Sequence, residues 1–308
     1  MMTNKLKYGF LTAICALTIS VKGQQETQNS FYMFNASLLN PAYAGSRDAL
    51  SVAADGRMQW VNWKGAPKTN CFTLHTPLVI ESVGLGLNVL NDQIGASSRN
   101  AIFADFSYRI RLNKANDRLA FGLRAGVDLI NNNFSNLAVN DNTDPLILQN
   151  SFTKTLFNTG AGVYLYGKRY FVGITAPKVI PNKLNDLSNF SSKEVIHMYL
   201  IAGYVFKLNS LWDLKPGATV RYTANAPLSI DGNLSVLFNQ KIWFGVMYRH
   251  GSAAGANIMY NFTPSVRLGY AYDYSITNMN KYNAGTHEVL FGIDLFKKQQ
   301  PVRSPRYF

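Results

Sequence analysis

The segment from Arg118 to Leu129 alternates strictly between two kinds of side chain over its whole length. The odd positions are apolar: Leu119, Phe121, Leu123, Ala125, Val127 and Leu129. The even positions are charged or small: Arg118, Ala120, Gly122, Arg124, Gly126 and Asp128. A period of two predicts a β-strand with different surroundings on its two faces. Strands of soluble sandwiches are typically about 5–6 residues long, whereas a tilted strand that crosses a bilayer needs about 9–11. The pattern therefore favours a membrane-spanning strand.

The composition agrees with a chain of such strands. Hydrophobic residues make up 47% of the chain and charged residues only 15%, whereas soluble domains average about 25% charged residues. This balance excludes intrinsic disorder, which combines low hydrophobicity with high charge. Beyond the first two dozen residues no apolar run reaches the length of about 18 residues that a spanning helix needs. A transmembrane β-barrel, apolar outside and polar inside, fits best.

Counting the alternating segments predicts fourteen antiparallel strands. They fall near residues 49–60, 69–77, 82–90, 102–111, 118–129, 157–166, 169–177, 196–208, 213–222, 228–238, 241–249, 254–262, 265–274 and 288–295. An even number is typical of bacterial outer-membrane barrels, and closure removes unpaired strand edges from lipid. The connections also separate into two sets. Every long one, such as 131–153 and 178–194, falls in the set predicted to be extracellular, and the predicted periplasmic turns are short.

The amino terminus predicts export. Lys5 and Lys7 precede a short apolar stretch that ends at Val21 and Gly23, as in a signal peptide of residues 1–23. We expect a periplasmic or lumen-inserted segment at 24–47, the barrel at 48–296 and a basic periplasmic tail at 297–308. The mature chain keeps one cysteine, Cys71, so no internal disulfide is expected.

The inward face is predicted to carry charges of both signs. They are Asp55, Arg57, Asp105, Arg109, Arg111, Arg118, Arg124, Asp128, Arg221, Asp231, Arg249, Arg267, Asp273, Glu288 and Asp294. Either a water-filled pore or a lumen crossed by ion-paired networks would explain them, and the near balance of signs favours networks. Small inward residues would leave room for an inserted segment: Gly84, Gly86, Gly122 and Gly126. Aromatic residues near strand ends predict interfacial girdles: Trp60, Trp63, Tyr164, Tyr166, Tyr170, Trp212, Trp243 and Phe296.

Several motifs follow one another in a specific order. They comprise Tyr32, Phe34, Asn35, Asn40 to Gly45, Arg57, Gln59, Trp60, Gly65, Pro67, Thr69, Gly84, Gly86, Asn91, Asp92, Gly95, Gly285, His287 and Glu288. In this order and spacing the chain resembles the PorP/SprF family of Bacteroidota outer-membrane proteins, associated with type IX secretion. The resemblance covers essentially the whole mature chain, and only the basic tail departs from it.

The resemblance implies a barrel in the cell outer membrane that serves protein secretion, gliding motility or cell-surface anchoring. The partners that it implies are a secreted surface protein with a C-terminal secretion domain, other components of the secretion system or periplasmic ring, and outer-membrane lipid. Asn40, Pro41 and Tyr43 match the family's starting motif and are candidate partner-binding residues. Packing of the amino-terminal segment is the favoured role for these three.

Two other functions stay open beside secretion: a passive porin or small-solute channel, and a membrane enzyme. The four histidines are scattered, and adjacent residues such as His287 and Glu288 face opposite sides of a strand. The polar loop around 132–144 lacks the spacing of a calcium site. No enzyme activity, metal or other cofactor is therefore expected. Nucleic acid is not an expected partner either, because the basic residues are spread over the strands.

Overall fold

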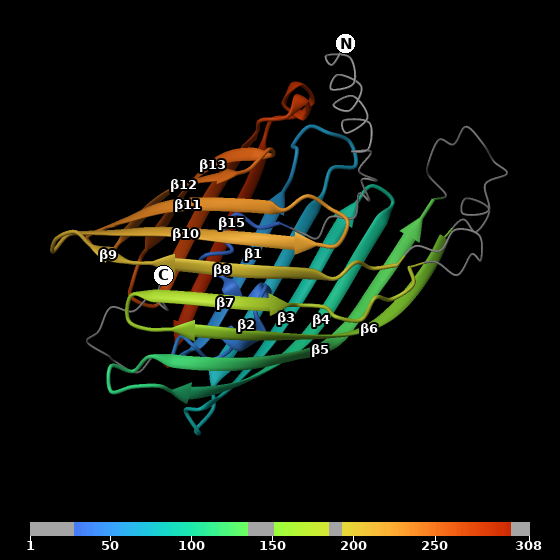
Figure 1. Ribbon diagram of the computed structural model, residues 1–308. Helices are drawn as coiled ribbons and strands as arrows, with labels where there is room; N and C mark the ends of the chain where they lie inside the picture. The colour runs from blue at the N-terminus through green and yellow to red at the C-terminus, as the bar shows by residue number, and fades with distance from the viewer. Residues whose placement is uncertain (1–27, 135–150, 185–192, 297–308) are drawn as a thin grey trace, which may run out of the picture.

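The computed structural model describes residues 28–134, 151–184 and 193–296. Its strands form one antiparallel sheet closed into a barrel (Figure 1). These strands are β1 (Leu50–Met58), β2 (Lys68–Pro77), β3 (Val83–Ile94), β4 (Ser97–Arg111), β5 (Arg118–Asn133), β6 (Ser151–Tyr166), β7 (Tyr170–Ala176), β8 (His197–Tyr204), β9 (Phe206–Lys207), β10 (Trp212–Thr223), β11 (Ser229–Phe238), β12 (Ile242–Arg249), β13 (Ala253–Asn261), β14 (Val266–Ser275) and β15 (Thr286–Leu295). The 3₁₀ helices are η1 (Ala36–Leu38), η2 (Pro41–Tyr43) and η3 (Asn278–Tyr282). No helix among the described residues is long and apolar enough to cross a membrane.

The sheet closes because its first strand pairs with its last. β1 pairs with β15 on one side and with β2 on the other. The short strand β9 continues β8, since both pair with β10, after a break at Val205. The barrel thus has fourteen strand positions, which confirms the predicted fold and strand number.

The two ends of the barrel differ in their connections. One end, which we call the long-loop end, carries residues 59–67 and 276–285 between strands, and β7 ends and β8 begins there as well. The other, the short-turn end, carries tight connections such as 167–169 and 239–241. Outer-membrane barrels turn their short connections to the periplasm, so the long-loop end is the extracellular one.

The β3–β4 connection is shorter than predicted. The sequence predicted strands near 82–90 and 102–111, but the two strands continue to a tight turn at Gly95 and Ala96. Asn91 lies opposite Asn100, and their side chains are joined by a hydrogen bond of 2.7 Å. Beyond the membrane both faces of a strand can meet water, so the alternation that marks a strand disappears from the sequence there.

The alternation predicted for β5 is confirmed. Phe121, Leu123 and Leu129 are exposed on the outer surface, whereas Arg124 and Asp128 are buried. Most of the predicted inward charges are likewise buried. Arg111 is not: it is exposed and donates to the carbonyl oxygens of Asn113 and Lys114 in the following turn.

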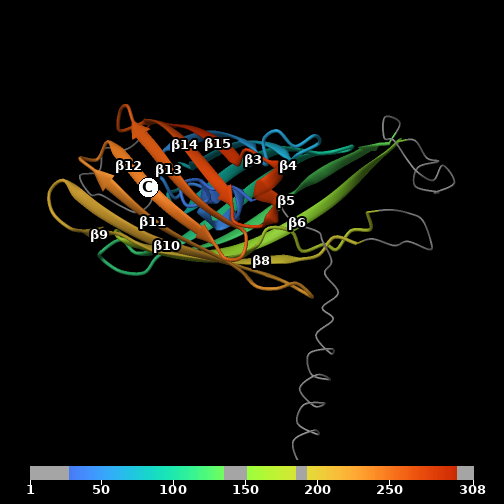
Figure 2. The same ribbon diagram turned by 90° about the horizontal axis from the view of Figure 1, so that it is seen from above.

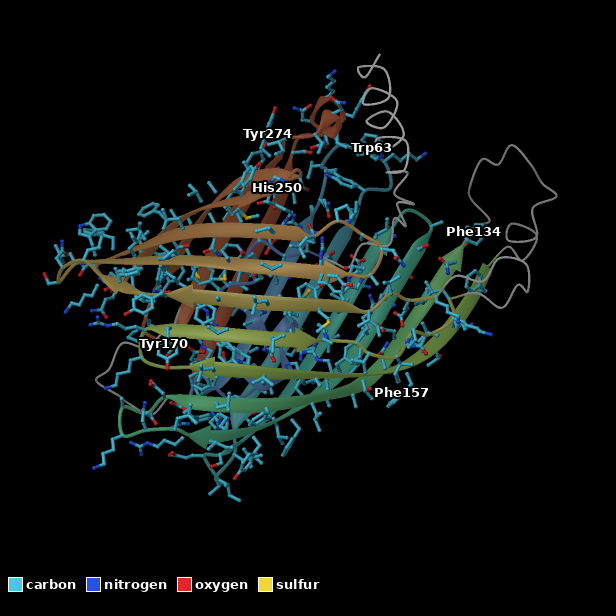
Figure 3. All side chains as sticks on the ribbon, in the orientation of Figure 1. Trp63, Phe134, Phe157, Tyr170, His250 and Tyr274 are labelled. Carbon is cyan, nitrogen blue, oxygen red and sulfur yellow. The ribbon has the colours of Figure 1, made fainter. Side chains whose placement is uncertain are left out.

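The predicted aromatic girdles are wrong at three positions. Tyr164, Tyr166 and Trp243 are buried inside the barrel instead of facing lipid. Trp243 shares the inward face of β12 with Arg249, six residues later, as a period of two requires. Trp63 does lie at the long-loop end and Tyr170 toward the opposite one (Figure 3).

Candidate functional site

Residues 28–48 lie inside the ring of strands, and we call this segment the plug (Figure 2). Residues 30–37 and 40–47 are buried without exception. The segment contains two short 3₁₀ helices, η1 and η2. Asn40 caps the start of η2, since its side-chain oxygen accepts from the N–H of Ala42 at 2.9 Å. Gly45, two residues after η2, has a φ of +72°. Glycine adopts that left-handed conformation without steric cost.

A buried ionic cluster holds the plug at the long-loop end. The Glu288 carboxylate accepts from the backbone N–H groups of Ser30 and Phe31 at 2.7 and 2.9 Å. Arg57 pairs with Glu288 at 2.6 Å and with Asp273 at 2.9 Å, and donates to the hydroxyl of Ser30 at 2.7 Å. Three strands and the plug therefore meet at one cluster.

A second ionic cluster holds the plug at the short-turn end. Arg47 makes two hydrogen bonds to Asp294, of 3.1 and 2.8 Å, and Asp294 also pairs with Arg267 at 3.2 Å. Burial alone would lower the pKa of Arg47, but the Asp294 carboxylate raises it, so the guanidinium stays charged. The plug thus descends from the long-loop end at Ser30 to the short-turn end at Arg47.

Between the clusters the plug is bonded to the opposite wall. Arg124 pairs with Asp105 at 2.7 Å and donates to the carbonyl oxygens of Ser37 and Leu38 at 2.7 and 2.8 Å. Asn40 donates to the carbonyl oxygen of Val163 at 3.1 Å. Buried charges of this kind are tolerated because each finds hydrogen-bond partners.

Glycines on the wall allow the plug backbone to approach closely. A Cβ atom at Gly122 would lie 2.1 Å from the backbone nitrogen of Ala42, and one at Gly84 would lie 2.3 Å from the carbonyl oxygen of Ala44. Of the four small inward residues singled out in the sequence, Gly126 differs, because its nearest neighbours belong to the adjacent strand around Phe103.

Aromatic side chains pack the remaining side of the plug. Phe34 contacts the ring of Trp243 edge-on at a centroid distance of 5.6 Å. The Lys215 ammonium lies 4.7 Å from the Phe34 ring centroid and donates to the carbonyl oxygen of Met33 at 3.2 Å. Sequence reasoning missed these contacts by assigning Trp243 to the lipid face. Its even spacing from Arg249 was the available signal.

The candidate partner-binding residues Asn40, Pro41 and Tyr43 are all buried within the plug. Tyr43 packs edge-on against His75 and Tyr164, at centroid distances of 5.3 and 5.5 Å. Asn40 and Tyr43 contact the barrel wall, and a direct role of the three residues in binding a partner stays a prediction.

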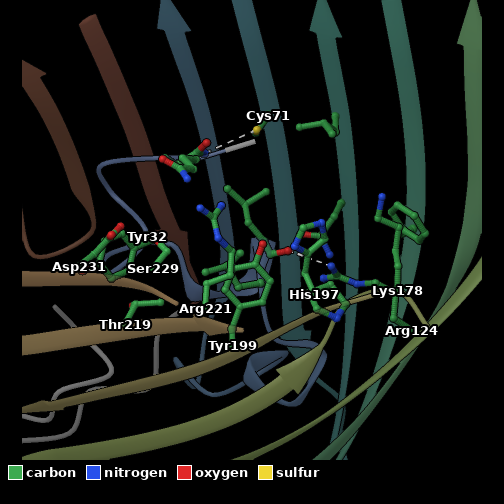
Figure 4. Close-up of a pocket in the computed structure, with 18 of the residues that line it drawn as sticks. Tyr32, Cys71, Arg124, Lys178, His197, Tyr199, Thr219, Arg221, Ser229 and Asp231 are labelled. Carbon is green, nitrogen blue, oxygen red and sulfur yellow. Dashed lines mark hydrogen bonds between the residues drawn. The ribbon is translucent and has the colours of Figure 1, made fainter. Parts of the chain in front are cut away.

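A cavity of about 120 Å³ lies between the plug and the wall (Figure 4). Its lining includes Gln28 and Tyr32 of the plug and, from the wall, Lys178, Tyr199, Arg221 and Asp231. Arg221 and Ser229 stand near the ends of β10 and β11 that face the long-loop end. The cavity therefore belongs to the extracellular half of the barrel.

His287 and Glu288 lie on opposite faces of β15, as predicted. The ring of His287 contacts the hydroxyl of Tyr270 on the outer surface at 2.7 Å, whereas Glu288 binds the plug inside. The two side chains therefore do not form a catalytic pair. No group of three or more metal-ligating side chains occurs within the described ranges.

A protein-family profile described as "Type IX secretion system membrane protein PorP/SprF" matches residues 21–293 of the chain. No curated protein matches it. The resemblance noted from the ordered motifs is thereby confirmed.

Among solved structures the chain is similar to the CymD monoaromatic hydrocarbon channel, with a TM-score of 0.53 and 13% identity over 86% of this chain and 92% of that one. It is also similar to the outer membrane protein Omp33 of Acinetobacter baumannii, with a TM-score of 0.45 and 9% identity over 81% of this chain and 100% of that one. The outer membrane phospholipase A of Escherichia coli gives a TM-score of 0.40 and 12% identity over 83% of this chain and 98% of that one. At these identities the likeness concerns the barrel fold alone.

Proposed function

The chain belongs to the PorP/SprF family of type IX secretion system membrane proteins, and from this premise we propose that it receives or anchors a secreted surface protein at its long-loop end. Its location is the cell outer membrane. The family and the fold point to a secretion component without enzymatic activity. Other components of the secretion system or periplasmic ring are proposed partners at the short-turn end. The basic tail at 297–308, which is expected on the same side, lies outside the described residues.

The observation that carries the proposal is the plug. Ionic clusters fix it at both ends of the barrel, through Glu288 and Asp294, and Arg124 and Asn40 fix it in between. A barrel whose lumen is crossed by its own chain is poorly suited to passive diffusion of solutes. A protein partner, in contrast, needs only the rim and loops of the extracellular end.

An exposed aromatic pair marks that end. Trp63, in the β1–β2 connection, and Tyr282, at the end of η3, contact edge-on at a centroid distance of 5.8 Å. Both are exposed, at 41% and 66%. Tryptophan and tyrosine are over-represented among the residues that dominate protein–protein binding energies, so this pair is the proposed contact.

The experiment measures how much of a secreted surface protein with a C-terminal secretion domain is retained on the surface of intact cells. Cells with the double variant Trp63→Ala/Tyr282→Ala should retain at least about tenfold less of the secreted protein than wild-type cells, because two binding residues are lost. Phe296→Ala is the control, since Phe296 is 88% exposed but lies after β15 at the short-turn end. Equal retention by the double variant and the wild type would contradict the proposal.

A further inference from the structure

Four cations line the cavity in the extracellular half, and among the described residues all but one of them are paired with a carboxylate. Arg124 is paired with Asp105, and Asp231 is paired with Arg249 at 3.0 Å. These ion pairs account for one cation and one anion of the lining.

Two further cations of the lining share two carboxylates behind them. Arg99 pairs with Asp128 at 2.8 Å, and Lys178 lies 3.9 Å from Asp128 and 3.3 Å from Glu194. This group is balanced in charge as well. Arg221 is then the cation left over.

Arg221 lies on the inward face of β10, opposite Tyr199 on β8 and Ser229 on β11. Within the described part of the chain its guanidinium has neither an ion pair nor a side-chain hydrogen bond. Figure 4 shows Arg221 and Tyr199 between Asp231 on one side and Lys178 and Arg124 on the other. A partly exposed guanidinium without an anion can bind a planar anion, because its N–H groups match a carboxylate in pairs.

The wall of the cavity is largely apolar. Phe103 and Leu90 come from the barrel, Tyr199 presents its ring, and Leu38 of the plug lies on the inner side. A free inorganic anion would not contact these apolar side chains. An apolar group attached to the carboxylate would cover them, and the cavity volume of about 120 Å³ suits a short group.

We propose that this cavity binds a carboxylate carried on a short apolar group, with Arg221 as the residue that holds the carboxylate. Two sources share this chemistry: a small apolar acid, and the carboxyl end of a peptide with an apolar last residue. The site is independent of whether the barrel anchors a secreted protein.

The test uses the purified full-length barrel in detergent and isothermal titration at low ionic strength. The probes are hexanoate, a tripeptide ending in leucine with a free carboxylate, and the same tripeptide as its carboxamide. We expect at least one carboxylate probe to bind and the carboxamide to bind about tenfold more weakly or worse. Binding of hexanoate identifies a small acid as sufficient, and binding of the peptide acid alone identifies a peptide end; both support the proposal.

Variants separate the site from non-specific attraction. Arg221→Gln should weaken the carboxylate probes about tenfold or more, and Arg221→Lys should keep part of the affinity, because the charge remains but the paired geometry is lost. Arg111→Gln, which removes an exposed cation at the other end, should change nothing. Heat-dependent migration in gels checks that each variant is folded.

Three outcomes would overturn the proposal. They are equal binding of carboxylate and carboxamide, unchanged binding in a folded Arg221→Gln protein, and no binding of any probe at millimolar concentration. Glu26 stands two residues before Gln28, which lines the cavity. Binding that occurs only in Glu26→Gln would also overturn it, because the chain's own acid would then be the ligand.

Discussion

At the scale of single residues, Arg57 connects the sequence motif to the plug. It stands near the extracellular end of β1, and its side chain is buried among Ser30, Asp273 and Glu288. The resemblance to the family singled out Arg57 and Glu288 by their motifs. Their mutual contact could not be predicted from strand patterns alone, because they lie 231 residues apart. Pairing of β1 with β15 brings them to directly opposed positions.

Arg57→Met is expected to lower the free energy of unfolding by about 3–5 kcal/mol, because Asp273 and Glu288 would lose their buried cation. Methionine keeps much of the length of the side chain, so the loss is mainly electrostatic. Urea unfolding in lipid or detergent measures the change. Arg111→Met is the matched control, since Arg111 is exposed and donates to turn carbonyls, and its effect should stay within about 1 kcal/mol. Similar values for the two variants would show that the cluster does not stabilise the barrel.

At the scale of structural elements, the strands and the plug differ in how far the sequence predicts them. β5 was predictable because lipid selects apolar side chains on one face and the lumen selects polar or small ones on the other. Where that contrast ends, as at Asn91 in the β3–β4 hairpin, the predicted strand was shorter than the observed one. Trp243 and Tyr164 were misplaced because aromatic residues suit both lipid and the packed plug, so only their spacing distinguishes the two faces. The irregular plug has no period, and its contacts follow from the closed barrel around it.

The direction of the plug gives a prediction about access. Ser30 is fixed at the long-loop end and Arg47 at the short-turn end, so Gln28 should be reached from outside the cell. In a Cys71→Ser background, Gln28→Cys is expected to react with a membrane-impermeant maleimide on intact cells. Ala115→Cys, exposed in the β4–β5 turn at the short-turn end, should react only after lysis. Labelling of Ala115→Cys and not Gln28→Cys on intact cells would reverse the orientation of the barrel.

At the scale of the whole molecule, the closed sheet and the plug together define what passes through the barrel. The fold was predictable because fourteen similar strands each repeat the same two-faced pattern, so errors at single strand ends do not change the architecture. The favoured interpretation of the inward charges as networks agrees with the observed pairs, such as Arg124 with Asp105 and Arg249 with Asp231. The cation Arg221 could not be singled out from the sequence, because whether a described carboxylate pairs with it depends on where the other charges lie in the folded barrel.

The most direct test of a plugged, partner-receiving barrel is the conductance of the purified wild-type protein in a planar lipid bilayer. The contacts of Arg47 with Asp294 and of Glu288 with Ser30 and Phe31 hold the plug across the lumen, so we predict no large, stable open channel. A large and persistent conductance from the intact protein would contradict this account and favour a passive porin.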